Sequence, residues 1–461
     1  MRIFKRVIAF LFALILMESV FTFLLEPVTF EHFLNYDIRE MKKNNDAAEL
    51  AFFGDSRAIR TFKPDIFEQE LTGTIEGSIN EGVNQQHIVS TYFYMKDFLR
   101  HNDVKCAVVN LNYEYFLNTT VEPIESKALT FDRIKSVPGM AEFVWERFKP
   151  TEYPNMLKSY RYRWQVKNIE DNLRRKTTKE YWEGIDTRED IHYVSKGYVT
   201  WDLAYKQGNT GTPAGVQPWT DSVVNEETLE YMDKMVQLCH DNGVRIIFVE
   251  SPMTIGRMYA IKGYQQFEET VQGKCEELEV PFYNLNLLKT ANLSIDDANF
   301  TDTEHMNDEG STKASHILGK IIKDQVLGND TTGYFYESFE KMNEEIAQIG
   351  ACDLFVWDTD TKQNEIPWEE LSDCKNESGN IVLQASSYAD DSVTVFYQFM
   401  ISTDAGKNYT ILQEYSLDNT VEIDKDELKN ATSENIYFRV DTKPENGNDL
   451  HHCYMERGLD E

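Results

Sequence analysis

The segment most informative about the fold reads Glu49-Leu50-Ala51-Phe52-Phe53-Gly54-Asp55-Ser56-Arg57. Its apolar run ends in a glycine, which predicts a short buried strand followed by a tight turn. Ser56 then opens a helix, so we expect its hydroxyl at the edge of a sheet, near free backbone N–H groups. A serine in such a place can act as a nucleophile if a base lies within hydrogen-bond reach.

The chain on either side of this stretch alternates between strand-like and helix-like segments. Apolar runs predict four further strands, at residues 74–79, 104–111, 244–249 and 280–284. Apolar residues at three- and four-residue spacings predict helices at residues 86–100, 226–242, 264–278 and 307–327. This alternation predicts an α/β fold, a three-layer, doubly wound domain with a parallel five-stranded sheet, over residues 48–328. Its functional site is expected at the carboxyl ends of the strands.

A polar, aromatic and basic segment interrupts the alternation between about residues 120 and 225. It contains Tyr160-Arg161-Tyr162-Arg163-Trp164 and Asn172-Leu173-Arg174-Arg175-Lys176, and no buried strand run is evident. We therefore predict a largely helical insertion. Its basic runs are interpreted as a solvated helix face, with contact to an anionic polymer or to lipid head groups as the alternative.

The C-terminal quarter of the chain has a different pattern. Residues 331–461 hold 28 acidic and 9 basic side chains, so over half of the net charge of −32 lies there. Short alternating runs at 380–384, 392–399, 410–413 and 435–440 predict strands. We predict an acidic, all-β sandwich-like accessory domain over residues 351–461, joined by a helical linker at 329–350. Exposed aromatics could bind glycan there, or the domain could be structural.

The six cysteines show no metal-ligand spacing, and no metal or cofactor is predicted. Cys106 lies in a strand-like run and is interpreted as a buried thiol. A disulfide within Cys352, Cys374 and Cys453 is the other open possibility.

The N-terminus has the composition of a membrane segment. Arg2, Lys5 and Arg6 precede 19 residues, Val7–Leu25, that carry a single charge, Glu18. This length suits a bilayer span, and the basic flank places the remainder of the chain outside the cytoplasm. We predict an uncleaved anchor at residues 1–25 and a tether at 26–47, with a signal peptide as the alternative. Glu18 either contacts a membrane partner or is simply tolerated in the segment.

Net charge limits the partners of the chain. A formal charge of −32 repels phosphate backbones, so we expect no nucleic-acid binding. The same charge argues against docking on anionic lipid or polymer through broad electrostatic attraction.

A base for Ser56 is offered by Asp302-Thr303-Glu304-His305, which stands just before the predicted last helix. His305 can remove the serine proton and return it to a leaving group. Asp302 lies three residues away and can hold the imidazole in the required tautomer. Ser56, His305 and Asp302 are therefore the predicted catalytic residues.

With these motifs the chain resembles the SGNH/GDSL hydrolase superfamily over about residues 48–325, apart from the insertion. The first block matches as Phe53-Gly54-Asp55-Ser56-Arg57 and the last as Asp302-Thr303-Glu304-His305. The resemblance implies an oxyanion hole built from the Gly82 N–H and the Asn112 side chain. Here the block around Asn112 reads Asn110-Leu111-Asn112-Tyr113, without the family's glycine and second Asn or Asp.

The anchor, the SGNH-like domain and the long insertion also resemble the membrane-anchored D-alanine transfer proteins and the polysaccharide O-acetyltransferases. That resemblance implies a serine acyltransferase or esterase at the cell membrane, acting outside the cytoplasm on O-acetyl or D-alanyl groups of cell-envelope polysaccharide. It also implies a membrane-bound O-acyltransferase as partner. The alternative is a non-catalytic, membrane-anchored scaffold or glycan-binding protein built on an inactive SGNH domain.

Overall fold

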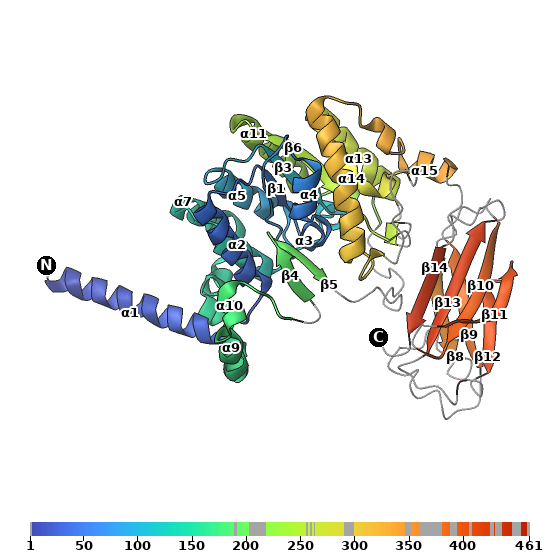
Figure 1. Ribbon diagram of the computed structural model, residues 1–461, viewed down its shortest axis with the longest axis horizontal. Helices are drawn as coiled ribbons and strands as arrows, with labels where there is room; N and C mark the ends of the chain where they lie inside the picture. The colour runs from blue at the N-terminus through green and yellow to red at the C-terminus, as the bar shows by residue number, and fades with distance from the viewer. Residues whose placement is uncertain are drawn as a thin grey trace.

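The computed structural model describes residues 2–188, 191–201, 218–254, 257–258, 261, 263–289, 299–345, 352–358, 380–387, 394–404, 408–424, 428, 436–444 and 453–458. Its central feature is a parallel sheet in the order β2-β1-β3-β6-β7 (Figure 1). The strands are β1 (Leu50–Phe53), β2 (Ser78–Asn80), β3 (Cys106–Leu111), β6 (Arg245–Glu250) and β7 (Phe282–Asn284). The predicted doubly wound α/β fold is therefore confirmed.

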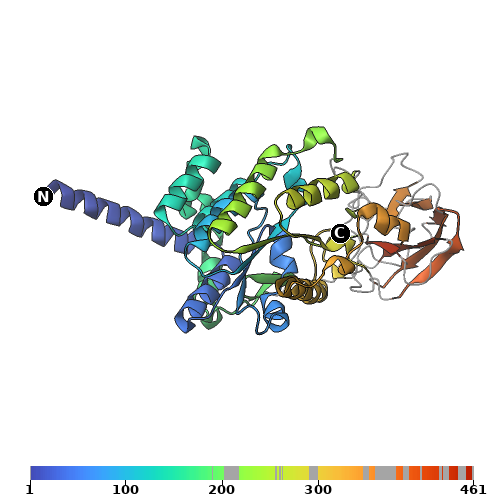
Figure 2. The same ribbon diagram turned by 90° about the horizontal axis from the view of Figure 1, so that it is seen from above.

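Helices cover both faces of this sheet. Figure 2 shows α14 (Asp308–Leu327) on one side, and α11 (Glu226–Asp241) and α13 (Tyr264–Glu277) on the other. Side chains alternate along each strand, so Phe52 packs into one apolar core and Phe53 into another. Further helices in the described part of this domain are α3 (Ser56–Thr61), α4 (Pro64–Glu70), α5 (Ile88–Leu99) and the short η1 (Tyr113–Phe116) and η5 (Leu285–Leu287).

The sheet order places the site between neighbouring strands. The chain passes from β1 outward to β2 and then crosses to β3 on the other side of β1. This reversal opens a crevice at the carboxyl ends of β1 and β3, where doubly wound folds hold their ligands. Ser56 and Asn112 follow these two strands.

The turn after β1 depends on Gly54. Its φ is +136°, and an added Cβ would lie 2.8 Å from the Cβ of Asn110 and 3.2 Å from the Asn110 carbonyl oxygen. Only glycine combines this backbone conformation with such a close approach to β3. Gly54 therefore lets the strand turn sharply into α3 and carry Ser56 to the sheet edge.

Replacing Gly54 by alanine is expected to lower the free energy of unfolding by about 2–4 kcal/mol, because backbone strain and overpacking add. Chemical denaturation of the full-length chain in detergent measures this change. Gly73→Ala is the matched control, since Gly73 has φ +78° but no atom within 4 Å of an added Cβ. Equal losses in the two variants would contradict the packing role of Gly54.

The insertion after β3 contains a hairpin as well as helices. The helices are α6 (Ile124–Arg133), α7 (Val137–Arg147), η2 (Pro150–Met156), α8 (Lys158–Arg161), η3 (Arg163–Asn168), α9 (Ile169–Lys176), α10 (Lys179–Glu183) and η4 (Asp221–Val223). The antiparallel strands β4 (Ile191–Ser195) and β5 (Tyr198–Trp201) are joined at Lys196 and Gly197, both with positive φ. A two-residue turn of this kind favours a hairpin, and the absence of a long apolar run concealed it in the sequence.

The C-terminal part of the chain forms two antiparallel sheets. One has the order β11-β10-β13-β14 and the other β12-β9-β8. The strands are β8 (Cys352–Asp358), β9 (Asn380–Ser387), β10 (Val395–Ser402), β11 (Thr410–Ser416), β12 (Thr420–Asp424), β13 (Tyr437–Pro444) and β14 (Cys453–Gly458). Leu383 of one sheet and Phe399 and Phe438 of the other share a single apolar core, which confirms the predicted sandwich.

Two further predictions concern this half of the chain. In the predicted linker the structure has η7 (Thr332–Tyr334) and a short helix, α15 (Phe339–Glu345); residues 346–350 lie outside the described ranges. Cys374 and the side chains of Cys352 and Cys453 also lie outside the described ranges, whereas Cys106 is a buried free thiol.

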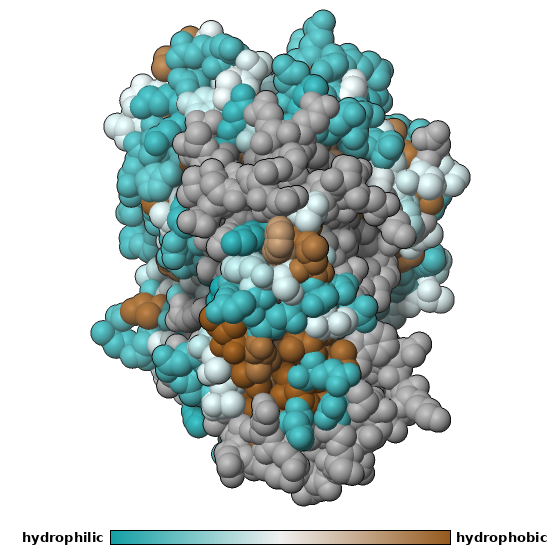
Figure 3. Space-filling model, turned by 90° about the vertical axis from the view of Figure 1, so that its right-hand side faces the viewer, coloured by the Kyte–Doolittle hydropathy of each residue, from teal (hydrophilic) through white to brown (hydrophobic). Residues whose placement is uncertain are grey.

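Figure 3 shows hydrophobic atoms gathered on the lower part of the face at the right of Figure 1.

The N-terminal segment forms the long helix α1 (Arg2–Leu25), which projects from the body (Figure 1). Residues Phe4–Leu25 are long and apolar enough to cross a membrane, and a signal sequence would have the same properties. A second helix, α2 (Phe30–Asn44), follows in the predicted tether and buries Phe33 and Leu34 in the core.

Candidate active site

Ser56 and His305 meet at the carboxyl edge of the sheet. The Ser56 Oγ lies 2.8 Å from the His305 Nε2, although 249 residues separate them in sequence. Ser56 is the first residue of α3, so its backbone N–H belongs to the helix-initial donors that have no acceptor within the helix. A hydroxyl, an imidazole and a free N–H donor are thus brought to one place.

Asp302 completes a hydrogen-bond chain behind His305. The His305 Nδ1 lies 2.8 Å from Asp302 Oδ2 and 3.0 Å from Oδ1. Oδ1 also accepts the backbone N–H groups of Glu304 at 2.9 Å and His305 at 2.8 Å. Burial acts to raise the pKa of Asp302, but the hydrogen bonds and charge of His305 outweigh it and hold the pKa below its ordinary value.

This arrangement fixes the tautomer of the imidazole. An ionised Asp302 accepts a hydrogen bond from the Nδ1–H group, so Nδ1 keeps its proton and Nε2 presents a lone pair to the Ser56 hydroxyl. The three residues therefore have the geometry of a nucleophile, its base and the carboxylate that orients the base.

An ion pair holds the loop that bears His305. Arg257 lies 2.6 Å from Glu304 and 2.8 Å from Glu114, which follows β3. The backbone N–H of Thr254 donates to the Thr303 carbonyl at 2.9 Å, linking the loop to the end of β6 as well. The histidine is thus fixed against two strands of the sheet.

Asp55 has a structural task beneath the serine. Its side chain is 2 % exposed and accepts four hydrogen bonds. The donors are the Arg57 N–H at 3.0 Å, Asn110 Nδ2 at 3.2 Å, Asn112 Nδ2 at 2.7 Å and the Tyr115 hydroxyl at 2.8 Å. The carboxylate therefore caps α3 and ties it to the segment after β3.

Asn112 and Gly82 lie beside the serine turn, and both already make hydrogen bonds. Asn112 gives one amide hydrogen to Asp55, and its oxygen accepts the Glu114 N–H at 3.0 Å. The Gly82 N–H donates to the Asn80 side chain at 3.1 Å. A Cβ on Gly82 would lie 3.1 Å from the Asp55 carbonyl, so Gly82 does approach the turn closely. Their oxyanion role stays a prediction.

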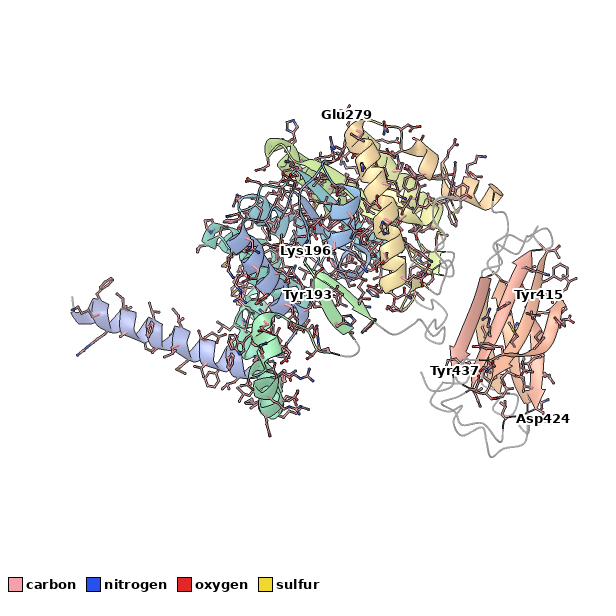
Figure 4. The ribbon with its side chains drawn as sticks, viewed as in Figure 1. Tyr193, Lys196, Glu279, Tyr415, Asp424 and Tyr437 are labelled. Carbon is pink, nitrogen blue, oxygen red and sulfur yellow. The ribbon has the colours of Figure 1, made fainter. Side chains whose placement is uncertain are left out.

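The hairpin β4–β5 packs along the same edge. Tyr193 and Lys196 (Figure 4) anchor it, since the Lys196 carbonyl accepts the Asn80 N–H at 2.8 Å. At its far end, the Trp201 ring centroid lies 3.7 Å from the Arg60 guanidinium carbon. Burial lowers the pKa of Arg60 to about 10, with Asp302 acting in the opposite direction. No motif in the sequence pointed to the pairing of Arg60 with Trp201.

A second buried carboxyl, Glu250, lies at the end of β6. Burial raises its pKa to about 7, against the influence of Arg57 and of the Tyr264 hydroxyl, which donates at 3.0 Å. The folded chain therefore binds a proton that the unfolded chain has lost above its ordinary pKa of about 4.3. Stability contributed by the protonated carboxyl is complete below that value and is lost as the pH rises towards about 7.

Glu250→Gln is expected to remove this pH dependence, because the amide keeps the size of the side chain and does not titrate. The free energy of unfolding of the wild type should fall relative to the variant by about 1–3 kcal/mol between about pH 5 and pH 8. Denaturant titrations at the two pH values measure the difference. Glu277→Gln, at a side chain 70% exposed, is the control and should keep the wild-type slope; a wild-type slope in Glu250→Gln would contradict the prediction.

Comparisons with known proteins add the following. No protein-family model matches the chain, and no curated protein is significantly similar to it. Similar solved structures include a GDSL-like lipase from Bacteroides thetaiotaomicron, with 12% identity, a TM-score of 0.28 and coverage of 64% of this chain and 98% of that one. A candidate acylhydrolase from Bacteroides fragilis shows 10% identity, a TM-score of 0.28 and coverage of 63% and 95%. Similarities this low do not assign a family.

Proposed function

We propose that the chain is a serine esterase or acyltransferase of the SGNH/GDSL type. The observation that carries the proposal is the continuous hydrogen-bond chain Ser56–His305–Asp302 at the carboxyl edge of a doubly wound sheet. The Gly-Asp-Ser turn after the first strand and the Asp-x-x-His segment before the last helix support the superfamily assignment.

The reaction follows from these positions. The Ser56 Oγ attacks the carbonyl carbon of an acyl ester while His305 Nε2 takes the hydroxyl proton. The negative charge on the carbonyl oxygen is held by the Ser56 N–H, with Gly82 and Asn112 as the proposed further donors. When the C–O bond to the leaving alcohol breaks, the imidazolium gives that alcohol the proton and an acyl-enzyme remains.

The second half of the reaction decides between two activities. His305 removes a proton from water or from a sugar hydroxyl, whose oxygen then attacks the acyl carbon and releases Ser56 with its proton restored. Water gives hydrolysis and a sugar gives transfer. The proposed substrates are O-acetyl or D-alanyl groups of cell-envelope polysaccharide. α1 is proposed as an anchor that holds the site outside the cytoplasm, near a membrane-bound O-acyltransferase.

The test uses the full-length chain in detergent. Labelling of Ser56 by a fluorophosphonate and a burst of nitrophenol from p-nitrophenyl acetate are the expected results, and neither should occur in Ser56→Ala. Absence of both in the wild type would favour the non-catalytic scaffold.

The cellular part of the proposal is tested separately by measuring polymer ester content by NMR in a deletion strain complemented with either form. Lower ester content with Ser56→Ala would support transfer, and higher ester content would support hydrolysis. Unchanged ester content would reject the proposed envelope substrate, while the proposal that the chain is an esterase would stand.

A further inference from the structure

One end of α1 is enclosed by a segment of the insertion, residues 150–183, which we call the collar. Ser159 donates its backbone N–H to the Glu18 carboxylate at 3.0 Å and its hydroxyl to the other oxygen. Thr22 donates to the same carboxylate at 3.2 Å. The acidic residue in the apolar helix is therefore satisfied within the chain itself.

The collar also caps the last carbonyls of α1. Lys176 Nζ donates to the carbonyl oxygens of Phe23 at 2.6 Å and Glu26 at 2.5 Å. Asn172 Nδ2 donates to those of Leu24 at 3.3 Å and Leu25 at 3.2 Å. The last carbonyls of a helix receive no hydrogen bond from within the helix, so they need donors from elsewhere. A lysine at this end is also favoured by the helix dipole. These contacts fix the position of the collar along the axis of α1.

The contact between Ser159 and Glu18 lies within the apolar part of the helix. Glu18 precedes Leu25 by seven residues, which corresponds to roughly 10 Å along the axis. The apolar segment Phe4–Leu25 is 22 residues long, so it reaches roughly 33 Å, close to the thickness of a bilayer core. If α1 spans the bilayer, the part of the collar around Ser159 must lie at the outer interface of the membrane.

The surface around the collar has the composition of that interface. Outside α1, fourteen large hydrophobic side chains are exposed in the described part of the chain, and nine of them lie between residues 137 and 185. All three tryptophans in this set are among the nine: Trp145, Trp164 and Trp182, with exposed fractions of 81%, 72% and 63%. Tryptophan is enriched where a membrane meets water. Figures 1 and 2 show the helices of this region on the side from which α1 projects.

The charge of the collar is opposite to that of the whole chain. Residues 157–176 hold seven basic and two acidic side chains, within a chain of net charge −32. Arg163 lies 3.9 Å from the Tyr160 ring centroid and 4.7 Å from the Trp164 ring, so the guanidinium and the aromatics form one surface. Arg174 and Arg175 both pair with the Asp171 carboxylate, so two positive charges share one negative charge. Such a surface suits anionic lipid head groups.

We infer that the collar is a second membrane-binding site, which docks its aromatic and basic side chains into the interface of an anionic lipid bilayer. The inference rests on the proposed anchoring by α1 and goes beyond it, since a single spanning helix does not by itself fix its tilt and rotation in the bilayer. Docking at two points fixes the orientation of the body relative to the bilayer, and with it the height of the site above the lipid.

The test places a fluorescent label on the collar. Trp164→Cys, labelled with an environment-sensitive NBD dye, is reconstituted as the full-length chain into vesicles containing phosphatidylglycerol and nitroxide-labelled lipid. A blue-shifted emission and strong quenching are expected. Leu327→Cys, at a position 61% exposed in α14, is the matched control and should show neither. The unsubstituted chain gives the background from native cysteines.

Three outcomes would overturn the inference. One is equal quenching at the two positions, and another is an unshifted, unquenched label at position 164. The third is a label that is shielded only in native membranes and not in pure lipid, which would identify a membrane protein as the occupant. Weaker quenching in phosphatidylcholine vesicles, or on addition of salt, would support the electrostatic part. Fluorophosphonate labelling of Ser56 in the same samples separates a failure of docking from a failure of the proposed chemistry.

Discussion

Replacing Ser56 by alanine is expected to reduce the turnover of p-nitrophenyl acetate by about 10⁴–10⁶-fold, to the level left by binding and oxyanion contacts. Within the described part of the chain, the Ser56 Oγ is the hydroxyl oxygen that His305 Nε2 contacts, at 2.8 Å. Without it no acyl-enzyme forms, and no other nucleophile in the described part of the site takes its place. The initial burst and the steady-state rate should disappear together.

The control for this prediction is Ser416→Ala, since Ser416 belongs to β11 in the C-terminal sandwich. It should keep the wild-type burst and the wild-type fluorophosphonate labelling. A Ser56→Ala variant that retains a burst would show that another residue carries the acyl group. A variant with unchanged steady-state turnover would contradict nucleophilic catalysis by Ser56.

The strands of the parallel sheet could be predicted because each forms a short apolar run that is visible in the sequence. A parallel strand is buried on both faces, so β3 and β6 read as continuous apolar runs. The short hairpin β4–β5 could not be found in this way, since only parts of it are buried. Strands β12 and β14 could not be found for a similar reason, because short antiparallel strands mix polar and apolar residues. β8 does contain an apolar run, Leu354-Phe355-Val356-Trp357, although it was not predicted as a strand.

The part of the site that depends on residue type and motif could be predicted from the sequence. Ser56, Asp302 and His305 could be named from motif and position, and the structure brings them into one hydrogen-bond chain. The contacts of Asn112 could not be named, because its bond to Asp55 depends on the distance between β1 and β3. The pairing of Arg60 with Trp201 depends likewise on where the hairpin packs.

Glu18 shows how a structure can change the meaning of a sequence feature. A carboxylate in an apolar helix indicates a partner, and a second membrane protein was one interpretation. The structure supplies Ser159 as that partner from within the same chain. Neither interpretation of the sequence named this contact, because Ser159 lies 141 residues away and belongs to no recognisable motif.

Replacing Asp302 by asparagine is expected to lower the turnover number about 10⁴-fold while leaving the fold intact. In the wild type, Oδ1 accepts the backbone N–H groups of Glu304 and His305. The amide oxygen of an asparagine must take this place, because an NH₂ group cannot accept these bonds. The NH₂ group then occupies the position of Oδ2, 2.8 Å from His305 Nδ1, and makes Nδ1 an acceptor. Nε2 consequently carries the proton and cannot remove one from Ser56.

This prediction has a direct spectroscopic readout, since nitrogen NMR distinguishes the two tautomers of His305 independently of activity. The backbone hydrogen bonds are retained, so the free energy of unfolding should change by less than about 1 kcal/mol. Asp308→Asn is the matched control, because Asp308 pairs with Lys63 in the same region and does not touch His305. The control should keep its activity within a few-fold of the wild type. An active Asp302→Asn variant with a proton on Nε2 would mean that Ser56 does not depend on His305 as its base.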